Sequence, residues 1–116
     1  MKKVLALVIA LMLVCALGCG ALAEEKDISE YTVVMIVKQS DPWFDDMEAG
    51  VTQLAADTGL NCYVLTPESG DPALQISIME DLISQGVDAI CCVPNDPQAL
   101  VPTIQKAREA GIIVVT

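Results

Sequence analysis

The chain has 116 residues, and its 16 Asp and Glu residues outnumber its 6 Lys and Arg residues, for a formal net charge of −10 at pH 7. Because nucleic acids carry a negative charge on every phosphate, this balance argues against a nucleic-acid partner. The length allows one small domain at most, and no change in composition marks a second one.

The amino end has the pattern of a secretory signal peptide. Two lysines precede an apolar run over residues 4–17, and small residues follow that run. The run is too short to be a membrane-spanning helix. Residues 1–23 are therefore predicted to be a signal peptide, and the chain is expected to be secreted across the cytoplasmic membrane.

Two processing routes for this leader remain open. The small residues that end at Ala23 fit cleavage before Glu24, which we favour, whereas the segment before Cys19 resembles a lipoprotein box whose Cys carries lipid. Either route places the protein in the periplasm or cell envelope, free or lipid-anchored. Acidic residues 24–30 would form a short lead into a folded domain over residues 31–116.

A repeated signal divides the rest of the chain: an apolar run, a polar stretch, Asp-Pro, a helix-like segment and then Gly. The Asp side chain can accept the first unpaired amides of a helix, and Pro at the next position lacks an amide that would go unpaired. Gly adopts the left-handed conformation that ends a helix. The Asp-Pro pairs begin at Asp41, Asp71 and Asp96, and the closing glycines are Gly59, Gly86 and Gly111.

Apolar patterns inside these units predict four strands and three helices. Almost continuous apolar runs indicate strands that are covered on both faces, and apolar steps of three and four residues indicate helices. Pro102 would break a helix interior, so the third regular helix is expected to begin near Ala99. The predicted strands are residues 31–37, 60–65, 87–93 and 112–115, and the predicted helices are residues 42–58, 73–85 and 99–110.

This alternation predicts an α/β fold, a three-layer sandwich in which a parallel sheet lies between layers of crossover helices. In the usual order for such a fold the first and third strands are adjacent, and ligands bind beyond the carboxyl ends of the strands. The candidate crevice therefore lies between the loops that follow residues 31–37 and 87–93.

The loop after the first predicted strand gives the strongest local signal for a ligand site. Lys38 and Asp41 offer charged hydrogen-bonding groups, and Trp43 and Phe44 offer aromatic rings. A sugar needs both kinds of contact, because its hydroxyl groups require donors and acceptors while its apolar ring face can lie against an aromatic plane. Simpler roles remain open: helix capping for Asp41, and packing of the first helical turn for the two aromatic residues.

Asn95 lies in the loop after the third predicted strand and would face the same crevice, although turn formation is the simpler role for it. Cys62, Cys91 and Cys92 fall inside apolar strands, where a thiol behaves as a small hydrophobic group. A disulfide between Cys62 and Cys91 or Cys92 stays open for a protein outside the cytoplasm, but the hydrophobic role is preferred. The sequence contains no CxxC or Cys/His metal spacing. Neither a metal nor a cofactor is therefore expected.

Short motifs along residues 37–111 form a specific combination, although each one alone is weak. They are Val37-Lys38, Pro42-Trp43-Phe44, Met47-Glu48 before Gly50, Gln85-Gly86-Val87-Asp88-Ala89-Ile90, Val93-Pro94-Asn95-Asp96 and Lys106-Ala107-Arg108-Glu109-Ala110-Gly111. Together they resemble the amino-terminal part of periplasmic sugar-binding proteins of ABC importers. The branch that looks most similar contains receptors for rhamnose and autoinducer 2.

The resemblance implies a two-lobed, type I binding protein that traps a pentose, a deoxyhexose or autoinducer 2 between its lobes and delivers it to an ABC permease in the membrane. It also implies that Lys38 holds the ligand, that Trp43 and Phe44 form an aromatic pair at the mouth, and that Asp41 is a polar group beside them. Residues 31–116 would then be a partial amino-terminal lobe, in a truncated form that ends before the acidic residue expected past the fourth strand and before the second lobe.

Two other classes of function compete with this one. An enzyme is not expected, because the sequence has no His, no G-x-S-x-G elbow, no P-loop and no dinucleotide glycine fingerprint. The alternative that stays open is a small secreted α/β interaction module without a ligand cleft. Cooperative unfolding of an isolated monomer that is indifferent to sugars would favour that module.

Overall fold

The structure of the protein is a computed structural model that describes residues 25–116. The predicted signal peptide, residues 1–23, and the possible lipidation site Cys19 lie outside the described residues. The described part of the acidic lead contains a short 3-10 helix, η1 (Ile28–Glu30), which Asp27 caps by accepting a hydrogen bond from the Ser29 amide. This segment leads directly into the first strand.

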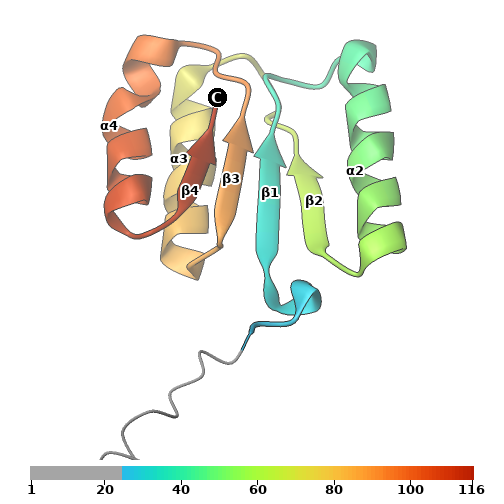
Figure 1. Ribbon diagram of the computed structural model, residues 1–116. Helices are drawn as coiled ribbons and strands as arrows, with labels where there is room; N and C mark the ends of the chain where they lie inside the picture. The colour runs from blue at the N-terminus through green and yellow to red at the C-terminus, as the bar shows by residue number, and fades with distance from the viewer. Residues whose placement is uncertain (1–24) are drawn as a thin grey trace, which may run out of the picture.

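Strands and α-helices alternate along residues 25–116, as the sequence predicts. The elements are β1 (Thr32–Ile36), α2 (Asp45–Thr58), β2 (Asn61–Leu65), α3 (Pro72–Gln85), β3 (Ala89–Cys92), α4 (Pro97–Glu109) and β4 (Ile113–Val115) (Figure 1). All strand pairs are parallel, and the strand order is β2-β1-β3-β4. The predicted α/β fold with a parallel sheet is confirmed, as is the adjacency of the first and third strands.

The Asp-Pro and Gly signals mark the helix ends as expected. The three Asp carboxylates each accept a backbone amide two residues ahead, from Trp43, Ala73 and Gln98. Gly59 and Gly86 take left-handed backbone angles, with φ of 76° and 71°, directly after α2 and α3. A short 3-10 turn, η2 (Pro42–Phe44), precedes the regular α2 helix.

The predicted start of the third helix near Ala99 is wrong, because α4 begins at Pro97 and holds Pro102 in its interior. Two capping bonds explain the earlier start: Asp96 Oδ1 accepts the amides of Gln98, at 2.9 Å, and Ala99, at 3.1 Å. Pro102 is tolerated because it and Gln98, whose carbonyl would have met the missing amide, are both exposed to water.

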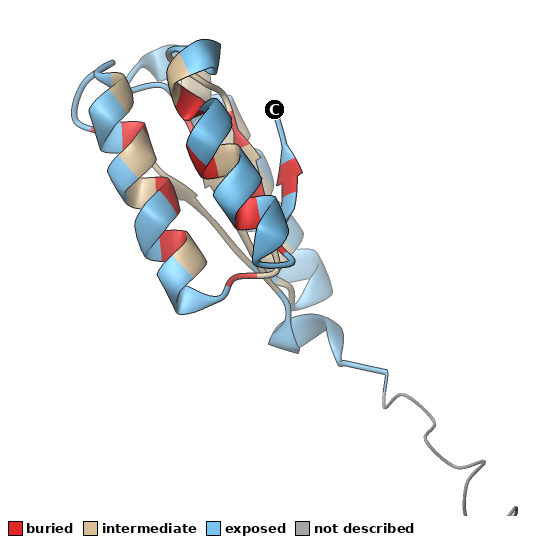
Figure 2. Cartoon of the chain, turned by 90° about the vertical axis from the view of Figure 1, so that its left-hand side faces the viewer, coloured by how far each residue is buried: buried red, intermediate tan, exposed pale blue. Residues whose placement is uncertain are grey.

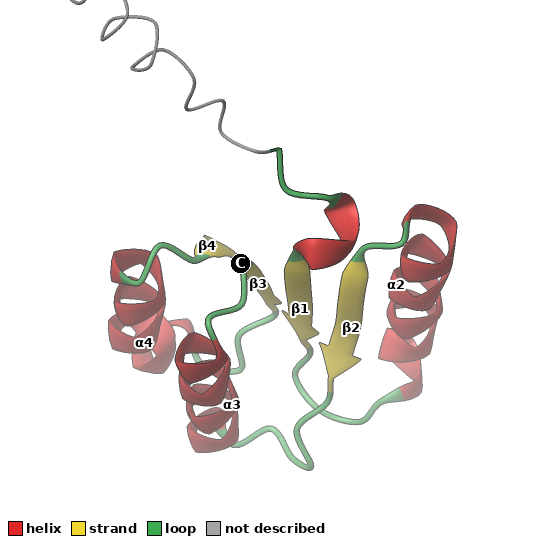
Figure 3. Cartoon of the chain, turned by 90° about the horizontal axis from the view of Figure 1, so that it is seen from below, coloured by secondary structure: helices red, strands yellow, loops and turns green. Residues whose placement is uncertain are grey.

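The core lies between the sheet and the α3–α4 pair. Fully buried side chains of the sheet face this helix pair, and β2 adds Tyr63 and Leu65 to its edge. Figure 2 shows the buried residues of the two helices in red, and Figure 3 shows α3 and α4 together on one side of the sheet while α2 lies beside β2. The core is made of Val34, Ile36, Met79, Leu82, Val87, Ile90, Cys92, Leu100, Ala107, Ile112 and Val114.

The opposite face of the sheet is only partly covered. A right-handed crossover from β1 to β2 places α2 there, and Cys62 Sγ lies 3.5 Å from the Val51 carbonyl oxygen of this helix. On β4, Ile113 is 66% exposed and Val115 is 56% exposed. Within residues 25–116 no helix is long and apolar enough to cross a membrane.

Asp88 ties the amino-terminal edge of the sheet together. Its Oδ2 accepts the Thr32 amide at 2.7 Å, and its Oδ1 lies 2.8 Å from the Lys26 ammonium. Its backbone amide donates to the Thr32 carbonyl, and its carbonyl accepts the Ile113 amide. The Lys26 ammonium and the Thr32 amide lower the pKa of the Asp88 carboxyl below its ordinary value.

Replacing Asp88 with Asn is expected to lower the thermal midpoint slightly at neutral pH. Because the folded-state pKa of Asp88 is lowered, the carboxylate stabilises the fold above the ordinary pKa of 3.8, and this contribution disappears as the pH falls through the folded-state value. Thermal unfolding followed by circular dichroism should therefore show the thermal midpoints of the wild type and of Asp88→Asn converging as the pH is lowered through the acidic range. Asp81→Asn, at an exposed position of α3, is the control, and a gap for Asp88→Asn that does not close in acid would contradict this role.

Candidate ligand-binding site

The loops that leave β1 and β3 meet at the carboxyl edge of the sheet. Parallel pairing continues one residue past each strand, since the Val37 amide donates to the Leu65 carbonyl and the Val93 amide donates to the Ile36 carbonyl. A hollow of about 420 Å³ opens directly beyond these residues. It is lined by Lys38, Gln39, Asp41, Trp43, Phe44 and Asn95. The five residues predicted from the sequence thus lie together around one hollow.

Lys38 is exposed at the mouth of a buried strand. Its neighbour Val37 is fully buried, which fixes the backbone from which the Lys38 side chain leaves. The ion pairs found in residues 25–116 join Lys26 to Asp88 and Lys106 to Glu80. Because neither pair involves Lys38, its ammonium has no ion-pair partner in this part of the chain and can contact a ligand.

The η2 turn presents the aromatic residues. Asp41 caps the turn, with its Oδ1 2.9 Å from the Trp43 amide, so the capping role considered for Asp41 is present in the structure. Trp43 is 73% exposed and therefore does not pack into the core, whereas Phe44 is half-buried. The two rings meet edge to face with centroids 5.0 Å apart. This contact orients the indole while leaving it open to the solvent.

Asn95 connects the two loops rather than only forming a turn. Its Nδ2 donates to the Lys38 carbonyl at 2.8 Å, and its backbone amide donates to Gln75 Oε1 at 2.7 Å. These bonds use the backbone amide and one of the two Nδ2 hydrogens of Asn95, and its Oδ1 makes no hydrogen bond to residues 25–116. The loop after β3 is therefore fixed to the loop after β1 across the hollow.

Gln39, which lines the hollow, and Gly70, which lies close to Gln39 and Asn95, were not predicted as part of the site. Gln39 lies in the loop that the sequence already marked, so its polar side chain was the available signal. Gly70 belongs to the loop after β2, in which no site residue was predicted. A Cβ atom on Gly70 would lie 3.0 Å from Gln39 Oε1 and 3.7 Å from Asn95 Oδ1. No local pattern signals this approach, because Gly70 is far from both residues in the sequence.

The set of groups around the hollow suits a neutral, hydroxyl-rich ligand. An ammonium, a carboxylate and carboxamides supply donors and acceptors, and an exposed indole supplies an apolar surface. Across residues 25–116 no group of three or more His, Cys, Asp or Glu residues could hold a metal ion. The chemistry available here is hydrogen bonding and stacking.

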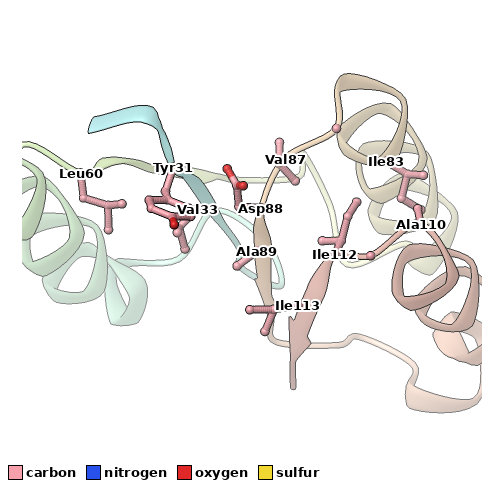
Figure 4. Close-up of a pocket in the computed structure, with 12 residues that line it drawn as sticks. Tyr31, Val33, Leu60, Ile83, Val87, Asp88, Ala89, Ala110, Ile112 and Ile113 are labelled. Atoms are coloured by element: carbon pink, nitrogen blue, oxygen red, sulfur yellow. The ribbon is translucent and has the colours of Figure 1, made fainter. Parts of the chain in front are cut away.

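A larger hollow of about 520 Å³ lies at the opposite, amino-terminal edge of the sheet, and most of its wall is apolar (Figure 4). Its charged residue is Asp88, whose carboxylate already binds Lys26 and the Thr32 amide. Its volume is greater, but it offers few free polar groups to fix the orientation of a ligand. The smaller hollow at the carboxyl edge is therefore the better candidate for specific binding.

The cysteines take no part in either hollow. Burial, together with the neighbouring Cys91, raises the pKa of the Cys92 thiol to about 11, so this thiol stays protonated and unreactive. Cys62 and Cys91 lie on β2 and β3, which β1 separates. Two strand spacings span about 9.5 Å, which is beyond the reach of a disulfide. Cys62, Cys91 and Cys92 are all free thiols.

Comparison with known proteins identifies the family. Residues 32–116 match the family model of the periplasmic binding protein domain, so the chain belongs to this family. The chain is 27% identical over 124 aligned positions to the ribose import binding protein RbsB of Bacillus subtilis, in an alignment that covers 100% of this chain and 40% of that protein. The resemblance stated from the sequence motifs is confirmed.

Solved structures agree with this assignment. A solute-binding protein of an ABC transporter from Burkholderia graminis, in complex with D-arabinose, is 32% identical with a TM-score of 0.73, and the match covers 77% of this chain and 31% of that one. A solute-binding protein from Clostridium phytofermentas with bound L-rhamnose is 34% identical with a TM-score of 0.68, covering 72% of this chain and 26% of that one. The chain thus spans less than half the length of these relatives.

Proposed function

We propose that the protein is the solute-binding component of an ABC transporter and that it captures a sugar or sugar-like ligand. The observation that carries this proposal is the convergence of Lys38, Asp41, Trp43, Phe44 and Asn95 on one hollow at the carboxyl edge of a parallel sheet. Membership of the periplasmic binding protein family and relatives that bind ribose, arabinose or rhamnose support it. A pentose or deoxyhexose suits the hollow better than a charged ligand, because the wall carries both an ammonium and a carboxylate.

Each residue has a separate task in this proposal. Lys38 donates from its ammonium to a sugar hydroxyl, and Asp41 accepts from another through the carboxylate oxygen that does not cap η2. Asn95 accepts through Oδ1, and one Nδ2 hydrogen donates to the Lys38 carbonyl, which helps to orient the carboxamide. Trp43 stacks against the apolar face of the sugar, and Phe44 holds the indole by its edge contact. None of these contacts requires covalent chemistry, in keeping with a binding protein rather than an enzyme.

Export and delivery follow from the same proposal. The leader over residues 1–23 would direct the protein across the cytoplasmic membrane, and the partner that receives the sugar would be an ABC permease. Mass spectrometry of the exported protein is expected to give an amino terminus at Glu24. A lipid-modified amino terminus at Cys19 would show the other processing route, and retention of Met1 in the exported fraction would contradict cleavage of a leader.

The direct test uses Trp43, which is the single Trp of the chain. Its emission should change in a saturable way when D-ribose, D-arabinose, D-allose, L-rhamnose or autoinducer 2 is added, because the indole lies at the hollow and is open to the solvent. Inositol and sodium chloride, added at the same osmolarity, serve as controls. An emission spectrum that none of the five compounds alters would contradict the proposal and favour the interaction module without a cleft.

A further inference from the structure

Gln75 is a polar side chain in a place where an apolar one would be expected. It lies on α3 between core residues, and its exposed fraction is 0%. Burying a carboxamide is unfavourable unless its donors and its acceptor find partners. Within residues 25–116 no buried side-chain nitrogen or oxygen lacks a hydrogen-bond partner, so the cost of burying Gln75 is offset by specific contacts.

Those contacts join the two sides of the candidate site. Gln75 Nε2 donates to the Val37 carbonyl at 3.0 Å and to the Val93 carbonyl at 2.9 Å, and Gln75 Oε1 accepts the Asn95 amide at 2.7 Å. Val37 directly precedes Lys38, and Val93 lies two residues before Asn95. One side chain thus holds the backbone at the ends of β1 and β3, directly beneath the hollow.

We propose that Gln75 is a positioning residue for the ligand site: it sets the spacing between the loop that carries Lys38 and the loop that carries Asn95. The proposal rests on the sugar-binding function proposed above. Gln75 does not line the hollow and does not touch the ligand. It acts through the backbone, and the Asn95 Nδ2 bond to the Lys38 carbonyl completes the link between the loops above it.

The chemistry of the side chain is specific to a carboxamide. Two carbonyl oxygens require donors and one amide requires an acceptor, and the Gln side chain provides both within one planar group. Leu has a similar size but leaves all three backbone groups unpaired. An ionised Glu would accept the Asn95 amide but would turn an oxygen toward two carbonyl oxygens, whereas a protonated Glu regains one donor.

The test compares Gln75→Leu with two control variants and follows two readouts. Gln85→Leu changes the exposed Gln at the end of the same helix, and Leu82→Ala removes core volume from α3 about two turns beyond Gln75. The first readout is hydrogen exchange of the Asn95 amide without ligand, and the second is the Kd for the sugar that gives the largest Trp43 response. Each Kd is measured under conditions in which the variant is folded by circular dichroism.

In Gln75→Leu we expect exchange of the Asn95 amide to accelerate about tenfold or more and the Kd to rise about tenfold or more. Gln85→Leu should behave like the wild type, and Leu82→Ala should lower the thermal midpoint while keeping the Kd. In Gln75→Glu the Kd is expected to fall back toward the wild-type value as the pH is lowered, because protonation restores a donor, whereas the wild type should show no such trend.

Three results would overturn the inference: wild-type exchange of Asn95 in Gln75→Leu, a Kd in Leu82→Ala that rises as much as in Gln75→Leu, or a Gln75→Glu Kd that does not depend on pH. The first of these needs no ligand and therefore judges the role of Gln75 by itself. Failure of the wild type to bind any of the sugars would instead contradict the proposed function. It would also contradict the claim that Gln75 supports sugar binding, but not the claim that Gln75 fixes the two loops.

Discussion

Replacing Lys38 with Met is expected to weaken sugar binding about tenfold to a hundredfold. A hydrogen bond to a charged group contributes about 1.5–3 kcal/mol, which corresponds to that range of Kd. Met keeps most of the aliphatic stem of Lys38, so the substitution removes the ammonium and little else. Because Lys38 is exposed and makes no ion pair within residues 25–116, the stability of the fold should not change. Titration of Trp43 emission measures the Kd.

Two further variants make this result specific. Lys106→Met removes the same charge from α4, where the ammonium pairs with Glu80 and faces no part of the hollow, so the Kd should stay at the wild-type value. Lys38→Arg keeps the charge and should keep part of the affinity. If Lys38→Met binds as tightly as the wild type, or if Lys106→Met loses as much affinity as Lys38→Met, Lys38 does not hold the ligand.

The largest expected effect on stability comes from Ile36→Ala. Ile36 is fully buried at the carboxyl end of β1, paired in register with Leu65 on one side and Cys92 on the other. Truncating a buried Ile to Ala costs about 2–5 kcal/mol through lost burial and the cavity left behind. Small domains are stable by about 5–15 kcal/mol, so much of the stability would be lost. Urea unfolding followed by circular dichroism measures the change.

Ile113→Ala provides the matched control within the same sheet. Ile113 lies on β4 and is 66% exposed, so its truncation removes little buried surface and should change the free energy of unfolding by less than about 1 kcal/mol. The comparison distinguishes two contributions to the free energy of unfolding: that of the core between the sheet and the α3–α4 pair, and that of the partly covered face of the sheet. Equal losses for the two variants would mean that Ile113 is buried in solution, and no loss for Ile36→Ala would contradict the described core.

The order of the elements could be predicted because its signals are local. Each Asp-Pro pair places a carboxylate beside the amides that it caps, and each Gly after a helix takes up a backbone angle that other residues avoid. Pro102 misled the prediction of α4, because this helix accommodates an interior proline at a turn where Gln98 and Pro102 are both exposed to water. Whether that turn is exposed depends on how α4 packs against the rest of the protein, and this packing cannot be predicted from the sequence of the helix alone.

The residues around the hollow could be predicted from their loop positions, but their connections could not. Lys38 and Asn95 follow strands that the sequence already placed side by side, so their approach follows from the topology. Gln75 gave no signal, because it sits among apolar residues of α3 and its partners lie far away in the sequence. Asp88 interrupts the apolar run of residues 87–93, and its bonds to Lys26 and to the Thr32 amide, both distant in the sequence, give the reason for a carboxylate there.

The most direct test of the central claim is an NMR titration of the chain with the sugar panel, read residue by residue. Chemical shifts are expected to move at Lys38, at the Trp43 indole and at Asn95, with saturation, while signals from the amino-terminal edge stay unchanged. Shifts that move instead at Gly86, Asp88 and Ile112, which line the larger hollow, or that move nowhere, would contradict a sugar site at the carboxyl edge of the sheet.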